Sequence, residues 1–129
     1  MNLNPMDLGV CGVEQVLHAG TVKFNSAGIA AGSILFVLPE NTIITGAVVN
    51  ISAAFNAATT NVLTVGKGTA FDDVFAAGEL EEGKVGATTK NLWLECDVET
   101  KITAKYTQTG TAATTGEADV FLKVVRKPK

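Results

Sequence analysis

The stretch IITGAVVNISAAFNAATTNVLTVGKG, residues Ile43 to Gly68, decides the fold of this 129-residue chain. Its apolar side chains alternate along the chain, and a period of two is typical of a β-strand with one buried face. The turn-rich hexapeptide NAATTN then leads to a second alternating run, NVLTVG, so the pattern predicts a hairpin. The odd positions of the first run are the better core candidates: Ile43, Thr45, Ala47, Val49, Ile51, Ala53 and Phe55.

The same alternation recurs on both sides of this stretch. TVKFN and SILFVL precede it, and KNLWLECDVE, KITAKYTQ and EADVFLKVVRK follow it. The Gly/Thr/Ala loop TGTAATTG joins the last two runs and predicts another hairpin. The helical spacing of Phe71, Val74 and Phe75 allows at most one short helix. Seven or so strands predict an all-β fold, an antiparallel β-sandwich or jelly roll, with an extended N-terminal arm (residues 1–15) and one sandwich domain (16–129).

The composition fits a single domain whose surface is poor in charge. Charged residues make up 18% of the chain, against about a quarter in a typical soluble domain. We therefore expect part of the surface to be buried against other subunits, as in a homo-oligomer such as a dimer or trimer. The net charge is -3, and the basic residues are scattered except for four near the end: Lys123, Arg126, Lys127 and Lys129. They provide no stripe for a phosphate backbone, so we expect no nucleic-acid binding.

The sequence lacks the marks of secretion, membrane insertion and zinc binding. Its first twenty residues have neither a positive n-region nor a continuous apolar h-region. The densest apolar run, ILFVL, has five residues, and we expect no membrane span. Cys11 and Cys96 lie far apart without a CxxC pair. A disulfide between them stays possible, but we expect reduced thiols in a protein made in the cytosol.

The residues give no catalytic constellation. His18 is the only histidine, and its nearest candidate partners, Cys11 and Asp7, lie outside any nucleophile-elbow or papain-like context. The motif VGKGT at residues 65–69 has a Gly-Lys pair, but it lacks the upstream glycine and the following Ser or Thr of a phosphate loop. A tight turn that closes a hairpin explains its glycines. We expect no enzymatic activity and no cofactor, with His18 on the surface or at a strand edge.

Two features leave ligand binding open. The strongest charge feature is a group of acidic residues: Asp72, Asp73, Glu79, Glu81 and Glu82. Calcium prefers such oxygens, but the D-x-D-x-D-G loop is absent, so a solvated loop is the favoured interpretation and we expect no metal. Trp93 and Tyr106 could form part of a sugar-stacking platform, although one Trp and one Tyr are more often core or interface residues.

The segment AAGSILFVLPENTIITGAVVNISAAFNAATTNVLTVGKG, followed by DDVFAAGELEEGKVG, resembles small virion proteins of tailed bacteriophages and prophages. In these proteins an apolar strand ends in Leu-Pro and leads to a long strand, an Asn/Thr turn, LTVG and an Asp-rich loop. ITAKYTQTGTAATTGEADVFLKVV is similar to their closing hairpin. The similarity covers roughly Ala30 to Val125 and rests on structural motifs.

This resemblance implies a head decoration (cement) protein, which binds subunits of the major capsid protein and stabilises the head. It implies a place on the capsid surface of the virion after synthesis in the host cytoplasm. The alternative is a receptor- or carbohydrate-binding module of a tail fibre or tailspike, with Trp93 and Tyr106 exposed beside polar loops. An N-terminal arm can add a strand to a neighbouring sheet. The predicted partner contacts lie in the arm and in one loop: Leu3, Met6, Leu8, Val10, Phe71, Val74 and Phe75.

Overall fold

The computed structural model describes residues 14–127, and within that range it contains seven β-strands and no helix. The strands are β1 (Glu14–Lys23), β2 (Ser33–Leu38), β3 (Thr42–Ala53), β4 (Thr60–Lys67), β5 (Gly86–Cys96), β6 (Thr100–Thr109) and β7 (Glu117–Arg126). Strands β2 to β7 coincide with or overlap the predicted runs. β1 overlaps the run TVKFN only at its last three residues and begins earlier than predicted, at Glu14. The predicted all-β fold is confirmed.

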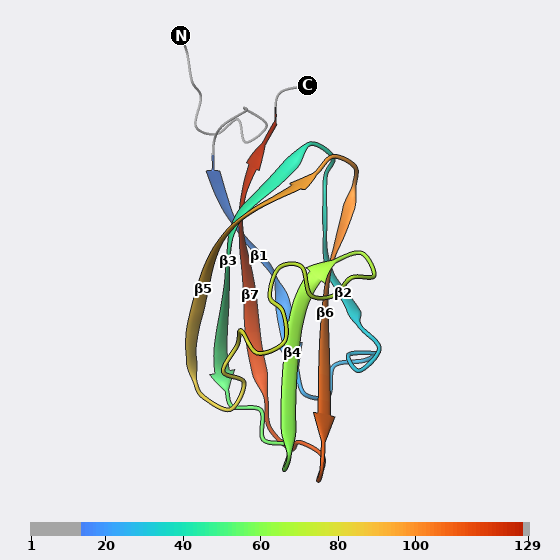
Figure 1. The fold of residues 1–129 in the computed structure, drawn as a ribbon, viewed down its shortest axis with the longest axis vertical. Helices are drawn as coiled ribbons and strands as arrows, with labels where there is room; N and C mark the ends of the chain where they lie inside the picture. Colours follow the sequence, from blue (N-terminus) through green and yellow to red (C-terminus); the bar gives the residue numbers. More distant parts are fainter. Residues whose placement is uncertain (1–13, 128–129) are drawn as a thin grey trace.

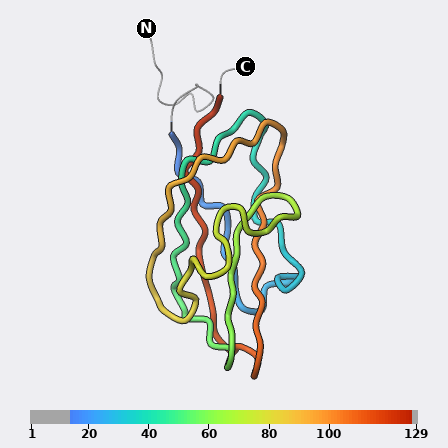
Figure 2. The backbone as a smooth tube through the Cα atoms, in the orientation of Figure 1, coloured from blue at the N-terminus to red at the C-terminus, as the bar shows by residue number. Residues whose placement is uncertain are grey.

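The strands form two antiparallel sheets that pack face to face (Figure 1). Sheet A has the order β1-β7-β3-β5, and sheet B has the order β2-β6-β4. Odd-numbered strands lie in one sheet and even-numbered strands in the other, so the chain changes sheet at every connection, as the tube in Figure 2 shows. Such a double sheet is the predicted β-sandwich, and its alternating connections are those of a jelly roll.

Both predicted hairpins are wrong. β3 and β4 lie in different sheets, and so do β6 and β7. Alternation tells which side of a strand is buried, but the inner faces of two opposed sheets carry the same pattern. The period of two therefore located the strands without identifying their neighbours.

β3 lies inside sheet A, between β7 and β5. Its register shifts between Ile44 and Gly46 against both neighbours, which marks a β-bulge. Ile44 faces the core before the bulge, and after it the odd positions do: Ala47, Val49 and Ile51. The predicted continuous odd face is therefore wrong at the start of the strand. There Ile43 lies on the outer side, shielded from solvent but outside the core cluster.

The core fills the space between the inner faces of the two sheets. Its largest fully buried side chains include Tyr106, Phe55, Phe75 and Leu38. The rings of Phe55 and Tyr106 lie 4.8 Å apart between centroids, and the Tyr106 hydroxyl donates a hydrogen bond to Asn61 Oδ1. Burial of each such side chain stabilises the fold by about 1.5–3 kcal/mol.

The first described strand and the last one meet at one end of the sandwich. Glu14, which begins β1, pairs with Val125 near the end of β7, and this end is at the top of Figure 1. The turn between β2 and β3 lies at the same end, because Asn41 in that turn accepts a hydrogen bond from the Lys127 amide at 2.7 Å. We call it the terminal end.

Candidate functional site

Residues 68–75, which we call the strap, follow β4 and fold back over the outer face of sheet B. A Cβ on Gly66 would lie 2.5 Å from both the Asp72 nitrogen and the Phe71 carbonyl carbon. Real Cβ atoms do not come this close to backbone, so β4 accepts the strap only because position 66 lacks a side chain. Gly66 therefore serves backbone contact, and the predicted hairpin-closing role of this glycine is wrong.

Phe71 fixes the strap onto the chain's own sheet. Its φ of 63° is in the left-handed region, which is uncommon for a bulky residue. The ring fills the space beside Gly32, where a Cβ would overlap it, and Lys105 Nζ on β6 lies 5.8 Å from the ring centroid. A predicted partner contact thus packs within the chain and stays only partly exposed.

Val74 and Phe75, the next predicted contact residues, close the free edge of β4. Their amides donate hydrogen bonds to the Val65 carbonyl at 2.9 and 2.8 Å, and Phe75 accepts one from the Val65 amide at 3.0 Å. Both side chains are buried in the core, with 0% and 1% of their surface exposed. They therefore have no side-chain surface left for a partner, and the structure gives them a core role.

The carboxylates of Asp73 and Glu82 accept hydrogen bonds from the β4 amides on either side of Val65. The Lys67 amide donates to Asp73 Oδ1 at 2.7 Å, and the Leu63 amide donates to Glu82 Oε2 at 2.9 Å. With Val65, three alternate amides of β4 are satisfied without a neighbouring strand, which protects an edge that could otherwise pair with another chain. Glu82 is only 9% exposed, so the prediction of a solvated acidic loop is wrong for this residue.

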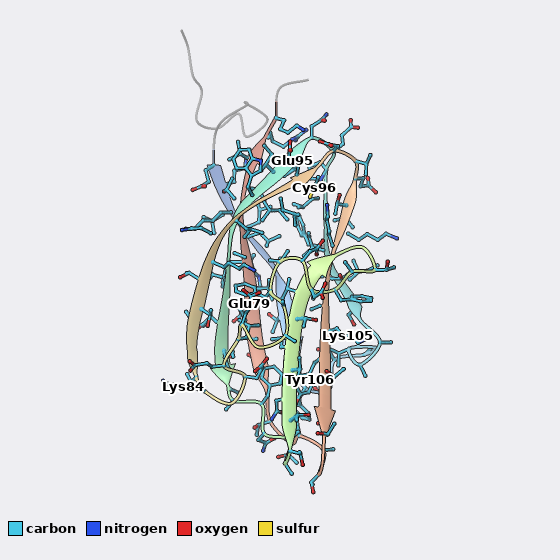
Figure 3. The ribbon with its side chains drawn as sticks, viewed as in Figure 1. Glu79, Lys84, Glu95, Cys96, Lys105 and Tyr106 are labelled. Atoms are coloured by element: carbon cyan, nitrogen blue, oxygen red, sulfur yellow. The ribbon has the colours of Figure 1, made fainter. Side chains whose placement is uncertain are left out.

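Glu79 joins the same acidic segment to β5. Its Oε1 accepts a hydrogen bond from Lys90 Nζ at 2.9 Å and another from the Ala76 amide at 2.6 Å. These bonds, that from Lys90 first, lower the pKa of Glu79 below its usual value. Figure 3 shows Glu79 in the loop beside β4. Between residues 14 and 127 no three His, Cys, Asp or Glu side chains gather as metal ligands would.

The outer face of sheet A has a different character. Its half toward the terminal end carries the charged Glu14, Lys123 and Glu95. Between them lie six apolar side chains, which we call the apolar face: Val16, Ile43, Val48, Trp93, Phe121 and Val125. Val16 on β1 is 64% exposed and Trp93 on β5 is 68% exposed. None of the six belongs to the core cluster between the sheets, although Ile43 is almost fully buried. The far half of this sheet face carries the polar Thr21, Asp119 and Asn50.

His18 lies on the edge strand β1 at the border of the apolar face. Half of its side chain is exposed, its Nε2 lies 3.2 Å from Asp119 Oδ1, and its ring centroid lies 5.0 Å from that of Phe121. The surface position predicted for His18 is confirmed. The candidate partners Cys11 and Asp7 lie outside the described residues, whereas Cys96 is a free thiol whose pKa burial raises.

The two aromatic residues proposed for sugar stacking do not form a platform. Tyr106 is 1% exposed and belongs to the core, whereas Trp93 stands on the outer face of sheet A. Figure 3 shows Tyr106 between the strands of the sandwich. The prediction that both rings lie exposed beside polar loops is therefore wrong for Tyr106.

The predicted arm falls mostly outside the described residues. Four of its contact residues cannot be placed in the fold: Leu3, Met6, Leu8 and Val10. Glu14 and Gln15, which we assigned to the arm, already belong to β1. Among residues 14–127, no helix is long and apolar enough to cross a membrane.

Sequence reasoning missed both the strap and the apolar face. Gly66 packs against the strap backbone, and the carboxylates of Asp73 and Glu82 accept hydrogen bonds from amides of β4. No local sequence pattern predicts contacts of this kind. The apolar face had a detectable signal. EADVFLKVVRK contains apolar residues at both alternating sets of positions, including Phe121 and Val125, so neither side of that strand is fully polar.

No protein-family model matches this chain, and no curated protein is similar to it in sequence. Solved structures of phage capsids contain chains of similar fold. A chain of the capsid asymmetric unit of cyanophage Pam1 has a TM-score of 0.68 at 20% identity, with 92% of this chain and 87% of that chain covered. A chain of the capsid of Ralstonia phage GP4 has a TM-score of 0.63 at 17% identity (93% and 88% covered).

A third chain comes from the acid-stable capsid of Helicobacter pylori bacteriophage KHP30, with a TM-score of 0.56 at 14% identity and coverage of 91% and 100%. At these identities the similarity establishes the fold. The β-sandwich of this chain, over more than nine-tenths of its length, is thus a fold also found in chains of phage capsids, in agreement with its resemblance to phage virion proteins.

Proposed function

We propose that this chain is a capsid decoration protein, which binds the major capsid protein on the surface of a phage head and stabilises the shell. The observation that carries the proposal is the shared fold: three chains from phage capsids align with at least 91% of this chain, and it covers at least 87% of each of them. A match over the whole length of both partners supports a similar role better than a shared motif would.

The apolar face supplies a surface for this association. Protein interfaces concentrate exposed aromatic and aliphatic side chains at their centre, and Trp is among the residues that contribute most to binding. Trp93 and Val16 expose about two-thirds of their surface on opposite edge strands of sheet A. We infer that capsid subunits, or further copies of this chain in a dimer or trimer, cover this face in the virion.

The strap supports the same assignment of faces. On sheet B, Ile34 and Val37 of the edge strand β2 stay 56% and 44% exposed. Around β4, Phe71 and the amide caps close the outer face and the edge within the chain itself. A partner that approached this side would have to displace packed side chains. On the apolar face of sheet A the Lys123 side chain lies over Gly46, and its flexible end can move aside more easily than packed core residues. This face is therefore the docking surface that we assign.

The test uses heads that lack the chain. Heads from a phage with the gene deleted should release their DNA at a lower temperature than complete heads, and addition of the purified chain should restore the higher temperature. A Trp93→Ser variant should restore it poorly, whereas Val85→Ser, which alters a 61% exposed residue away from the apolar face, should act like the unaltered chain. Equal release temperatures with and without the chain would refute a stabilising role.

The receptor- or carbohydrate-binding alternative retains one observation, the exposed indole of Trp93. Aromatic rings stack on sugars when they stand beside polar groups, and Trp93 has Asn91 and Glu95 on either side of it along the outer side of β5. The apolar Val16, Val48 and Phe121 on the same sheet face favour a protein contact, to which we assign Trp93. Binding to a glycan array that Trp93→Ser abolished would favour the alternative.

A further inference from the structure

An open cavity of about 250 Å³ lies between the two sheets at the terminal end. Its lining residues come from the start of β1, the turn between β2 and β3, and the end of β7: Gln15, Leu17, Leu38, Pro39, Thr42, Val124 and Arg126. Most of these side chains are apolar. The Thr42 hydroxyl donates a hydrogen bond to the Pro39 carbonyl at 2.7 Å, so its proton is already engaged.

Arg126 gives this cavity its chemical character. It is the only arginine of the chain, and it continues the inward-facing row of β7 that includes Val124. Its Nε is buried and lacks a hydrogen-bond partner, alone in this respect among the buried side-chain nitrogen and oxygen atoms of residues 14–127. An unmet donor on a charged group is costly, and such groups in native proteins call for an explanation.

Three acidic side chains near the terminal end are engaged with other residues. Lys127 Nζ lies 3.0 Å from Glu95 Oε1 and 2.6 Å from Asp97 Oδ1. Glu14 accepts a hydrogen bond from the Thr45 hydroxyl at 2.8 Å on the outer side of sheet A. The described part of the chain thus forms no ion pair with the guanidinium of β7.

We propose that this cavity receives an acidic side chain of a capsid subunit, whose carboxylate pairs with the Arg126 guanidinium. Because Nε is buried, the guanidinium must turn toward the cavity before Nε and an adjacent Nη can both donate hydrogen bonds to this carboxylate. Arginine presents parallel N–H donors that match a carboxylate in this way. The aliphatic stem of an aspartate or glutamate would lie against Leu17, Leu38 and Val124. The volume is sufficient, because an apolar cavity of about 150 Å³ holds benzene.

A carboxylate fits this site better than a phosphate does. The cavity contains a single cation, which balances one negative charge, whereas a phosphate group carries about 1.5 to 2 charges at pH 7. The remaining charge would be desolvated against Leu38 and Pro39. The cavity also opens at the same end as the apolar face, so one partner can occupy both. This assignment of the partner's chemistry rests on the proposed capsid function.

The first experiment tests the site without a capsid. Because Arg126 is the only arginine, arginine labelled with ¹⁵N gives a single Nε–Hε signal in the full chain. We expect this signal to move saturably when sodium acetate is added and to stay in place with sodium chloride of equal ionic strength. A linear drift common to both salts would mean that no carboxylate binds, and the proposal would fail.

A second spectrum identifies the source of the carboxylate. Asp7 is the only acidic residue in the first thirteen positions, so the chain's own N-terminal segment is the competing donor. We expect the Nε–Hε signal of an Asp7→Asn variant to match that of the unaltered chain. A shift of the signal in this variant would assign the site to Asp7 and overturn the capsid partner.

The third experiment measures binding to heads that lack the chain. We expect Arg126→Met to bind on the order of a hundredfold more weakly, because the partner's carboxylate would stay buried and unpaired. Arg126→Lys should recover only part of this loss, and Lys101→Met, an equal charge change on an exposed residue of β6, should bind normally. Unchanged binding of Arg126→Met would refute the proposal. If the unaltered chain itself does not bind heads, the decoration function fails, and the acetate titration then decides the site alone.

Thermal unfolding separates a binding role from a structural one. Arg126→Met removes a partly buried charge without a described partner, so the variant should melt at the same or a higher temperature than the unaltered chain. A clearly lower melting temperature would mean that Arg126 supports the fold, and any loss of head binding would then have no bearing on a carboxylate.

Discussion

The outer faces of the two sheets differ in what covers them. On sheet B the chain's own strap crosses Gly66, places the Phe71 ring beside Gly32 and closes the edge of β4 with backbone and carboxylate hydrogen bonds. On sheet A the apolar face leaves Val16 and Trp93 about two-thirds exposed. The chain thus covers the β4 side of sheet B itself, while Ile34 and Val37 on β2 stay 56% and 44% exposed. The exposed aromatic side chain lies on sheet A, which is the side that we assign to a partner.

The largest loss of stability should come from Phe75→Ala, which removes a fully buried ring at the edge of sheet B. Loss of a buried Phe costs about 3–5 kcal/mol of unfolding free energy, because the transfer energy is lost and a cavity remains. Urea unfolding followed by Trp93 fluorescence measures the change. A loss below about 1 kcal/mol would mean that the loop after β4 does not contribute to the core as described.

Glu82→Ala should have the next largest effect. It leaves the buried Leu63 amide without its acceptor, which costs about 1–3 kcal/mol. Glu82→Gln is the matched control, because its amide oxygen can still accept this bond. If the two variants unfold at the same urea concentration, the carboxylate does not cap β4 in the way that the geometry indicates.

Glu79→Gln tests the outer part of the same segment and should cost less than about 1 kcal/mol, because the pair with Lys90 is partly exposed. The hydrogen bond from Lys90 holds the folded pKa of Glu79 below its ordinary value of 4.5. Its contribution is therefore present above that pH and disappears as the pH falls through the folded pKa. Unfolding curves of both proteins should differ at pH 7 and converge near the folded pKa. A constant difference across this range would contradict the assignment.

The smallest effect on stability should come from the open side. The double variant Val16→Ser/Trp93→Ser changes two exposed residues, so its unfolding free energy should stay within about 0.5 kcal/mol of the unaltered chain. The matched control is Val85→Ser/Ile34→Ser, whose target residues are 61% and 56% exposed and lie outside sheet A. Only the first pair should weaken association with heads or self-association in sedimentation experiments. A large loss of stability would mean that the chain itself covers the apolar face.

The strands of this fold could be predicted because each sheet has one buried side, which imposes a period of two on the sequence. Their partners could not, since β3 and β4 carry inward-facing residues that meet across the core rather than along one sheet. The β-bulge after Ile44 could not be predicted either, because Ile43 and Ile44 are equally apolar and only the strand register shows which one faces the core.

The candidate site was harder to predict than the fold. The spacing of Phe71, Val74 and Phe75 indicated an apolar loop, and the structure shows that this loop packs on its own sandwich. An apolar residue that contacts a partner and one that contacts its own chain look alike in a sequence. The sequence did not predict the cavity beside Arg126, because its walls come from β1, the turn after β2 and β7, which are far apart along the chain.

Cryo-electron microscopy of the intact phage particle would show directly where this chain lies and which of its faces meets the shell. We expect density on the outside of the shell, with the apolar face of sheet A against a capsid subunit or another copy of the chain and the strap toward solvent. Density confined to the tail, or a capsid contact made through the strap while Val16 and Trp93 face solvent, would contradict this expectation.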